Sequence, residues 1–243
     1  MSISLSVRRG WPVTRVAVPV GLSGLAAFVF TRAQDQLGRN RGTDRGDARY
    51  LIRVERLLHI DVEPTATRWL STHPHLAYGA GLLYELALLL PWVAIVVAGV
   101  RDAALTRRAL ASLFLFTTLS LVPFWLFPTA PPRFGEPGVV DIVTRFRVFA
   151  TETHSTESAI DVDASMPSLH VAWAWWCAAV LWRVPRRAGD LPRWTVWLIP
   201  AAVAVVVVVT GNHYLLDVAA GAALAAGGNA VFLRRQRAEL RTG

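Results

Sequence analysis

The sequence predicts an all-α fold, a polytopic membrane helical bundle with six transmembrane helices and with both termini in the cytoplasm. Of its 243 residues, 53% are hydrophobic and 17% are charged, and the mean hydropathy is +0.40. Soluble proteins carry about 25% charged residues, so this balance favours a membrane protein. Six mostly apolar segments approach the roughly 20 residues that a bilayer-spanning helix needs. The chain from 1 to 243 is therefore predicted to be a single membrane domain.

The six apolar segments are separated by short polar connections and two longer loops. They run from Pro12 to Phe30, His75 to Val100, Leu105 to Phe127, Pro167 to Trp182, Trp194 to Thr210, and Tyr214 to Leu233. The first segment is followed by Thr31 and Arg32 rather than by small residues. It therefore lacks a signal-peptide cleavage site and is predicted to be an anchor.

Arginine placement predicts the orientation of these segments. All 25 basic residues are arginine, and four groups of them lie before segment one, between two and three, between four and five, and after six. These groups are Arg8, Arg9 and Arg15; Arg101, Arg107 and Arg108; Arg183, Arg186, Arg187 and Arg193; and Arg234, Arg235, Arg237 and Arg241. With six spans all four fall on one side, which the positive-inside rule makes cytoplasmic. Because the net charge of +8 is distributed among the connections, membrane topology explains it better than a nucleic-acid partner does.

The loop 33–73 is predicted to lie on the outer side. Its apolar positions Leu51, Val54, Leu57 and Leu58 follow a helical period. An amphipathic helix at the outer membrane interface would explain that pattern.

The residues that carry chemistry lie in the helices and loops of 105–233. His213 and Asp217 are four positions apart at the mouth of the last segment, so they share one helix face. An ionisable pair at the end of a membrane helix is costly unless it functions or is satisfied internally. The predicted role is an Asp-supported imidazole that attacks phosphorus and carries the phosphoryl group as phosphohistidine.

Two further motifs fall on the same outer side. His170 follows Pro167, Ser168 and Leu169 at the start of the fourth segment, where it could give a proton to a leaving oxygen. Free amides of Ser168 and Leu169 in this first turn would suit a phosphate. Arg133, after two prolines, offers a planar fork to phosphate oxygens. The topology thus predicts one site from residues 80 positions apart.

Other interpretations of the same residues remain open. His170, His213 and Asp217 could together bind zinc, since histidine and aspartate both serve as zinc ligands. A transporter or a non-catalytic lipid-binding protein is the alternative from another class. The single cysteine, Cys177, excludes a disulfide within the chain.

Pro167-Ser168-Leu169-His170 and His213-x3-Asp217 resemble the second and third motifs of the type 2 phosphatidic acid phosphatase superfamily. Pro131-Pro132-Arg133 is similar to the first motif of the branch with inositol phosphorylceramide synthases. The resemblance implies a six-helix enzyme in the plasma (inner) membrane, with no metal or cofactor and an active site on the outer side. It also implies His213 as nucleophile, Asp217 as its support, His170 as acid/base, and Arg133 and Ser168 as phosphate ligands. A phosphorylated membrane lipid is the implied substrate, and water or a lipid alcohol the acceptor.

The chain departs from the phosphatase pattern at three positions. Leu126 stands where that pattern has lysine, Leu169 where it has glycine, and Val207 where it has arginine. The phosphate site is therefore less basic than in phosphatases, unless Arg145 or Arg147 compensates. Leu169 and the Pro-Pro-Arg form both favour the phosphotransferase branch.

Overall fold

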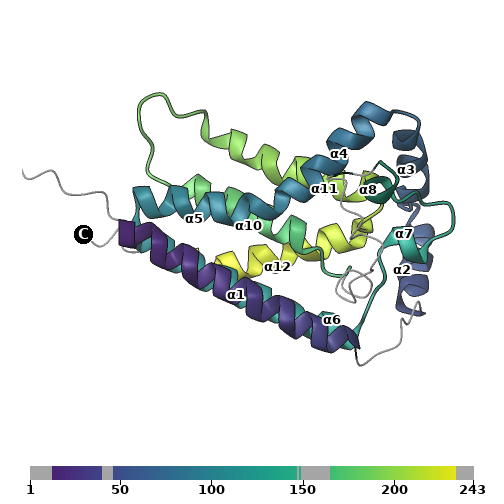
Figure 1. The fold of residues 1–243 in the computed structure, drawn as a ribbon, viewed down its shortest axis with the longest axis horizontal. Coiled ribbons are helices and arrows are strands. Elements are labelled where there is room, and N and C mark those ends of the chain that lie inside the picture. Colours follow the sequence, from purple (N-terminus) through teal and green to yellow (C-terminus); the bar gives the residue numbers. More distant parts are fainter. Residues whose placement is uncertain (1–12, 40–45, 147, 149–164, 234–243) are drawn as a thin grey trace, which may run out of the picture.

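The computed structural model describes residues 13–39, 46–146, 148 and 165–233. Every regular element in these ranges is helical, which confirms the all-α prediction (Figure 1). The Arg8–Arg9 and Arg234–Arg241 groups and Arg147 lie outside the described residues.

Four stretches are long and apolar enough to cross a membrane. They are Val16–Ala33, Pro74–Arg101, Ala103–Leu126 and Leu215–Phe232. The first lies within α1 (Val13–Arg39), the third is α6 (Ala103–Leu126), and the fourth belongs to α12 (Leu215–Leu233). The second is interrupted: α4 (Pro74–Leu86) leads through a short 3-10 turn, η1 (Ala87–Leu89), into α5 (Leu90–Arg101). Pro91 stands in the first turn of α5, where its missing N–H costs nothing.

The other two predicted spans are shorter in the structure. α10 (Leu169–Arg183) has 15 residues, about 22 Å of helix against the roughly 30 Å of a hydrocarbon core. α11 (Leu198–Val209) continues η3 (Arg193–Trp197), and together they form a second shorter apolar stretch. Six crossings therefore stay a prediction.

α10 lies at the centre of the bundle, where it contacts α5, α6, α11 and α12. Its Trp176 is fully buried and donates from Nε1 to the backbone oxygen of Ala109 on α6 at 3.1 Å. A second polar contact joins α6 to α12, where the Ser112 hydroxyl donates to Asn229 Oδ1 at 2.9 Å. α10 is thus surrounded by protein over much of its length and is held in place by its neighbours.

The outer faces of the long helices expose large apolar side chains. On α1 these include Leu22, Leu25 and Phe28, each at least half exposed. Contiguous exposed apolar surface of this kind is typical of contact with lipid. The structure therefore supports a membrane protein from its surface as well as from its helix lengths.

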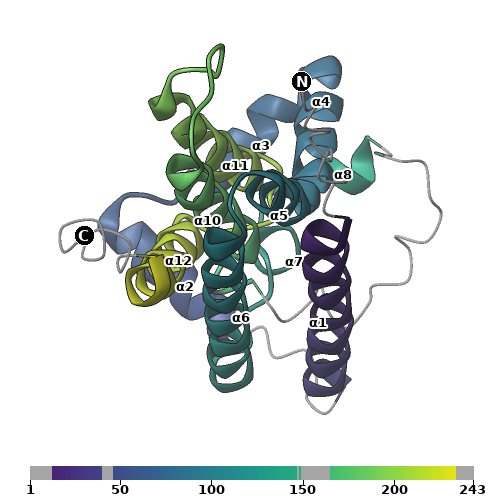
Figure 2. The same ribbon diagram turned by 90° about the vertical axis from the view of Figure 1, so that its left-hand side faces the viewer.

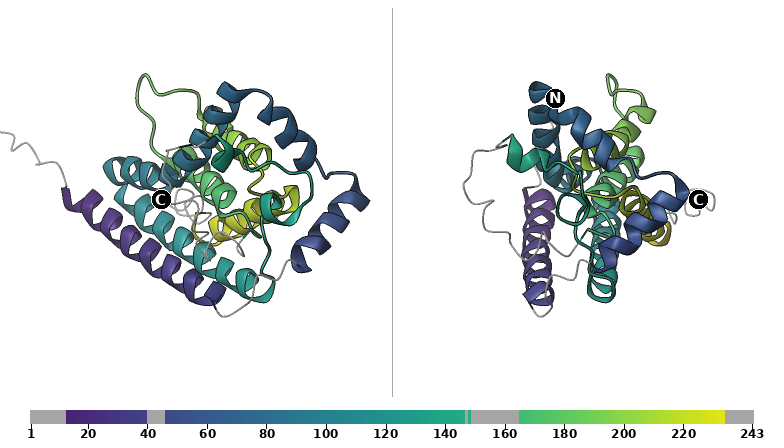
Figure 3. Two further views of the ribbon diagram at one scale, coloured as in Figure 1. Left: turned by 45° about the vertical axis from the view of Figure 1, so that its right-hand side comes forward. Right: turned by 90° about the vertical axis from the view of Figure 1, so that its right-hand side faces the viewer.

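The connections separate into two ends of the molecule. α2 (Gly46–Leu58), α3 (Glu63–Ser71), α7 (Pro132–Gly135) and α8 (Ile142–Arg145) gather at one end (Figures 1 and 3). At the other end, Arg101, the last residue of α5, pairs with Asp190, which follows α10, at 3.2 Å. Figure 2, viewed from that second end, shows α1 beside α6 and α5. The connections that carry Arg101 and the arginines of 183–193 thus lie at the opposite end from the predicted chemical motifs.

The predicted interfacial segment forms α2 and α3 rather than one helix. Leu51 and Ile52 of α2 are buried against Tyr214, whereas Leu57 and Leu58 remain 80% and 57% exposed. The predicted helical period is present in α2. This helix has one face that packs against the protein and one face that is exposed.

Candidate active site

His213 stands in the break between α11 and α12, and this break needs a glycine. Gly211 has a φ of +79°, in the left-handed region. A Cβ there would come within 2.9 Å of the Val139 side chain and 3.0 Å of the Val140 backbone oxygen. The Gly211 carbonyl accepts a bond from the Arg133 N–H at 3.0 Å. The backbone of the first motif is thus fixed to the turn that carries the histidine.

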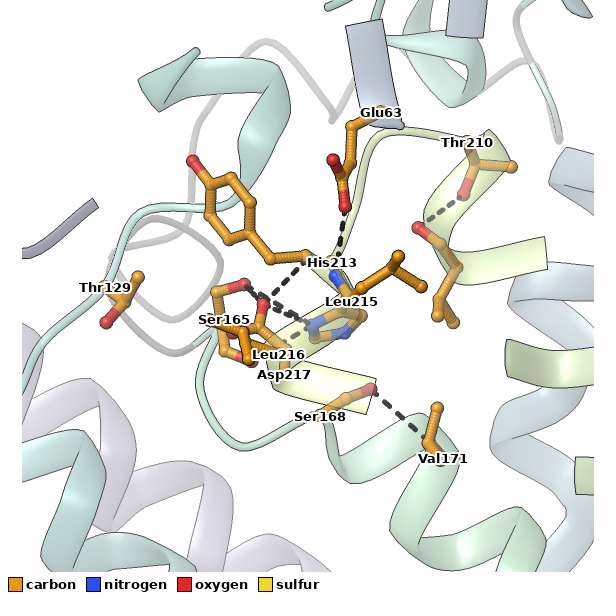
Figure 4. A network of polar contacts seen from close by, with 12 residues as sticks. Glu63, Thr129, Ser165, Ser168, Val171, Thr210, His213, Leu215, Leu216 and Asp217 are labelled. Carbon is orange, nitrogen blue, oxygen red and sulfur yellow. Dashed lines mark hydrogen bonds and ion pairs between the residues drawn. The ribbon is translucent and has the colours of Figure 1, made fainter. Parts of the chain in front are cut away.

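The imidazole of His213 has a defined tautomer. Its Nδ1 lies 3.0 Å from the backbone oxygen of Ser165 (Figure 4). A carbonyl oxygen can only accept, so Nδ1 carries a proton, and in the neutral ring Nε2 keeps its lone pair. The side chain is 7% exposed, and a neutral ring in this tautomer presents an unprotonated nucleophilic nitrogen.

Asp217 supports the position of the His213 imidazole largely through its bonds to Ser165 and to the Tyr214 N–H. Its Oδ2 lies 3.4 Å from His213 Nδ1, and the same oxygen accepts from the Ser165 hydroxyl at 2.5 Å. It also accepts from the Tyr214 N–H at 3.0 Å, so the third residue of α12 satisfies the amide that precedes the helix. One fully buried carboxylate therefore joins the start of α12, the Ser165 segment and the imidazole.

His170 faces His213 from the first turn of α10. The two ring centroids are 5.8 Å apart, and the His170 ring stacks on Tyr84 of α4 at 4.4 Å and 25°. Within the described part of the chain, its buried Nε2 has no hydrogen-bond partner. A buried imidazole nitrogen without a partner beside the first histidine is well placed to exchange a proton with a bound substrate.

Ser168 is fully buried at the start of α10, and its polar groups contact protein. Its Oγ accepts from the Val171 N–H at 3.4 Å as a helix cap, and its own N–H donates to the Asp217 backbone oxygen at 3.0 Å. This amide was expected to point toward a ligand, and the structure differs. The cause is the close approach of α12, where a Cβ on Gly221 would overlap the Ser168 carbonyl.

Arg133 lies in α7 beside the Gly211 turn, with its side chain 13% exposed. Its Nε is 3.7 Å from Asp141 Oδ2, and its guanidinium lies over the Phe134 ring at 4.7 Å. Arg145 ends α8 with its guanidinium 5.9 Å from the Phe146 ring centroid. Arg133 is the arginine that the described structure attaches to the histidine turn.

Sequence reasoning missed three residues at this site. The sequence does offer a signal for Ser165, because this residue lies two positions before Pro167 and so just before the second motif. Glu55 and Glu63 carry no such signal, because they are isolated acids within the loop 33–73. Glu63 Oε1 accepts from the Leu215 N–H at 3.0 Å, and Glu55 Oε1 from the Leu216 N–H at 2.8 Å.

Both glutamates are fully buried. Burial raises the pKa of Glu55 to about 8 and that of Glu63 to about 7, although the backbone N–H bonds oppose the shift. Their neighbour Glu136 also has a raised pKa because it is buried, and it pairs with Arg56 at 3.1 Å.

Metal binding was an open alternative for His170, His213 and Asp217. Among the described residues, no three histidine, cysteine or acidic side chains are arranged so that they could hold a metal ion. The Asp217 oxygen nearest the imidazole is already bonded to Ser165 and Tyr214.

Comparison with known families matches residues 49–231 to the PAP2 superfamily. The chain belongs to this superfamily, whose members are generally phosphatases and phosphotransferases of lipid phosphates. No curated protein and no solved structure matches the chain. The matched range contains Arg133, Ser165, His170 and His213, and it also includes Glu55 and Glu63.

Proposed function

We propose that this protein is a membrane lipid-phosphate phosphatase or phosphotransferase that works through a phosphohistidine on His213. The observation that carries the proposal is the Nδ1–Ser165 carbonyl bond, which in the neutral ring leaves the lone pair on Nε2 of His213, beside the ring of His170. A positioned base-form nucleophile and an acid on the other side of a phosphoester are the groups that covalent phosphoryl transfer requires.

In the first step, His213 Nε2 attacks phosphorus. The P–N bond forms as the ester P–O bond breaks, and protonated His170 gives its proton to the leaving oxygen. The positive charge that the imidazole develops lies 3.4 Å from the Asp217 carboxylate, which stabilises it.

In the second step, water or a lipid hydroxyl attacks phosphorus. Neutral His170 takes the proton of the attacking oxygen as the P–N bond breaks, which restores both histidines. Arg133 would bind phosphate oxygens in both steps, after exchanging its 3.7 Å contact with Asp141 for the substrate. Ser168 would contribute by capping α10 beside the phosphate.

A lipid substrate is supported by an apolar cavity whose lining residue Trp173 lies beside His170. About 410 Å³ of almost wholly apolar space lies between α1, α5, α6 and α10. Trp173 lines it, and the Trp173 ring is 6.3 Å from the His170 ring. The volume lies within the usual range for ligand pockets, and the lining suits a hydrocarbon chain.

Transfer to a lipid alcohol, as in inositolphosphotransferases, is the second candidate. A separate cavity of about 550 Å³ lies on the other side of the second motif, lined by Met166 and Pro167 with Tyr50, Phe127 and Leu224. Two apolar cavities flanking one site would hold a donor and an acceptor lipid together. The Pro-Pro-Arg form of the first motif supports the same branch.

We place the site at the outer leaflet of the plasma membrane. The arginines of the two described connections at the far end, 101–108 and 183–193, support this orientation through the positive-inside rule.

The test uses purified protein in vesicles with a ³²P-labelled lipid phosphate, with and without a lipid alcohol, in excess chelator. Free phosphate indicates a phosphatase, and a new lipid phosphodiester indicates a transferase. His213→Ala should abolish both turnover and an acid-labile phosphoenzyme, whereas His75→Ala, at an exposed position, should retain both. Turnover by His213→Ala would overturn the mechanism, and loss of wild-type activity in chelator would favour a metal.

A further inference from the structure

The first turn of α12 is held by three carboxyl groups that come from three different helices. A helix leaves its first N–H groups without partners inside the helix. Here the Tyr214 N–H is bonded to Asp217 of α12 itself, the Leu215 N–H to Glu63 of α3, and the Leu216 N–H to Glu55 of α2. Three successive backbone donors beside His213 are therefore each bonded to a buried acid.

We propose that Glu55 and Glu63 are positioning residues for His213, holding the first turn of α12 so that its imidazole meets both Ser165 and the substrate. This inference rests on the proposed function, because it assigns the two glutamates a part in the same reaction. They act through the backbone of α12 and touch no reacting atom.

The geometry explains why the anchor matters. Leu215 and Leu216 follow His213 by two and three residues, so a rotation of this turn moves the imidazole directly. The His213 bond to Ser165 depends on a separate segment, which Asp217 ties to the same turn. Displacement of a reacting group by about 1 Å can cost about 100-fold in rate. Two bonds, from α2 and α3, fix the turn, and Figure 4 shows the one between Glu63 and Leu215.

The pair also affects where a phosphate can bind. The N-terminus of a helix ordinarily attracts anions. At α12, acid groups already occupy these donors, and the nearby charged groups are Asp217, Glu136 and its partner Arg56. The substrate phosphate is therefore directed toward Arg133 and the start of α10.

The experiment separates an acceptor role from simple packing. Glutamine keeps a carbonyl oxygen in place of the carboxyl oxygen, whereas leucine fills a similar volume with no acceptor. The variants are Glu55→Gln, Glu55→Leu, Glu63→Gln and Glu63→Leu, and Glu136→Gln is the matched control for a buried acid that pairs with Arg56. Turnover is measured with a short-chain phosphate ester, together with hydrogen exchange at the Leu215 and Leu216 amides.

Each leucine variant should lower kcat by about 100-fold with little change in KM. Each glutamine variant should stay within about fivefold of wild type, since the amide oxygen still accepts the backbone N–H. Glu136→Gln should leave kcat unchanged. Exchange protection should be lost at Leu216 in Glu55→Leu and at Leu215 in Glu63→Leu, and retained in the glutamine variants.

Folded leucine variants with wild-type kcat would overturn the proposal, and so would an effect on KM alone. Glutamine variants as slow as the leucine variants would also overturn it, because charge rather than the acceptor would then matter. If the leucine variants do not fold, free exchange of both amides in the wild-type protein decides against the anchor. A wild-type protein that shows protected amides but no phosphoester turnover would instead refute the proposed function.

Discussion

The Nδ1 atom of His213 lies closer to the Ser165 backbone oxygen, at 3.0 Å, than to the Asp217 carboxylate, at 3.4 Å. The tautomer of the proposed nucleophile is thus set by a backbone carbonyl, which no side-chain substitution removes. Asp217 fixes that carbonyl indirectly, through the Ser165 hydroxyl, and its charge remains near enough to stabilise an imidazolium.

Asp217→Asn should therefore slow the enzyme by less than the equivalent change in a serine-protease triad. Loss of that carboxylate costs about 10⁴-fold in the protease, partly through the wrong tautomer. Here the carbonyl keeps the tautomer, so we expect a fall in kcat of roughly 100-fold from lost charge stabilisation. Ser165→Ala, which leaves both the carbonyl and the charge, should cost about 10-fold. A 10⁴-fold loss in Asp217→Asn would show that the carboxylate sets the tautomer after all.

Removing the proposed acid should penalise poor leaving groups selectively. His170→Ala lacks the nitrogen that would protonate the ester oxygen, and general acid catalysis contributes about 10²–10⁴-fold. We expect that loss for an alkyl phosphate and a much smaller one for para-nitrophenyl phosphate, whose leaving group needs no proton. Equal losses for both esters, measured as kcat/KM, would contradict the assignment.

Stability should fall as pH rises from about 5 to 8. Glu55 and Glu63 have folded-state pKa values of about 8 and about 7, above the ordinary glutamate value of 4.5. The folded protein therefore binds more protons than the unfolded chain in this window, so deprotonation with rising pH favours unfolding. Tm should drop between pH 5.5 and 8, by roughly 2–4 °C for each kcal/mol lost.

Glu55→Gln should flatten that pH slope, because the amide does not titrate. Asp190→Asn is the control at the opposite end: its pKa is lowered by Arg101, so its contribution is lost only at acid pH. A Glu55→Gln protein with the wild-type slope would mean that the carboxyl is already ionised across this range.

Two glycines of α12 should respond differently to alanine. A Cβ at Gly221 would overlap the Ser168 carbonyl, whereas a Cβ at Gly227 meets nothing within 4 Å. Gly221→Ala should destabilise the protein by about 1–3 kcal/mol and lower activity, because the second motif must move away from α12. Gly227→Ala should be neutral or should stabilise by up to about 1 kcal/mol, from helix propensity. Thermal unfolding and kcat of the two variants check this contrast.

Filling the cavity between α1 and α10 should affect lipid substrates alone. Ala26→Trp places an indole in the apolar space, while Leu25→Trp changes an exposed neighbour. We expect Ala26→Trp to raise KM for a long-chain lipid phosphate and to leave a short-chain ester unaffected. Leu25→Trp should match wild type with both. Equal kinetics of Ala26→Trp and Leu25→Trp on the long-chain lipid would show that the chain binds elsewhere.

The sequence determined the helical class and identified the groups that we propose carry the chemistry. Apolar runs and arginine-rich connections are local properties of the chain, so they predict helices and their order without any tertiary contact. The His213–Asp217 spacing likewise follows from helix periodicity. The number of crossings did not follow, because the length of α10 depends on where Ser168 caps it and on the helices packed around it.

Only the tertiary structure decided how the site is held. Ser165 meets His213 across 48 residues, and Glu55 and Glu63 meet α12 across more than 150. Sequence periodicity does not predict contacts between residues so far apart in the chain. The sequence also does not distinguish a buried glutamate from an exposed one. The pairing of these acids with particular backbone amides depends on how α2 and α3 pack against α12, which is a property of the assembled bundle.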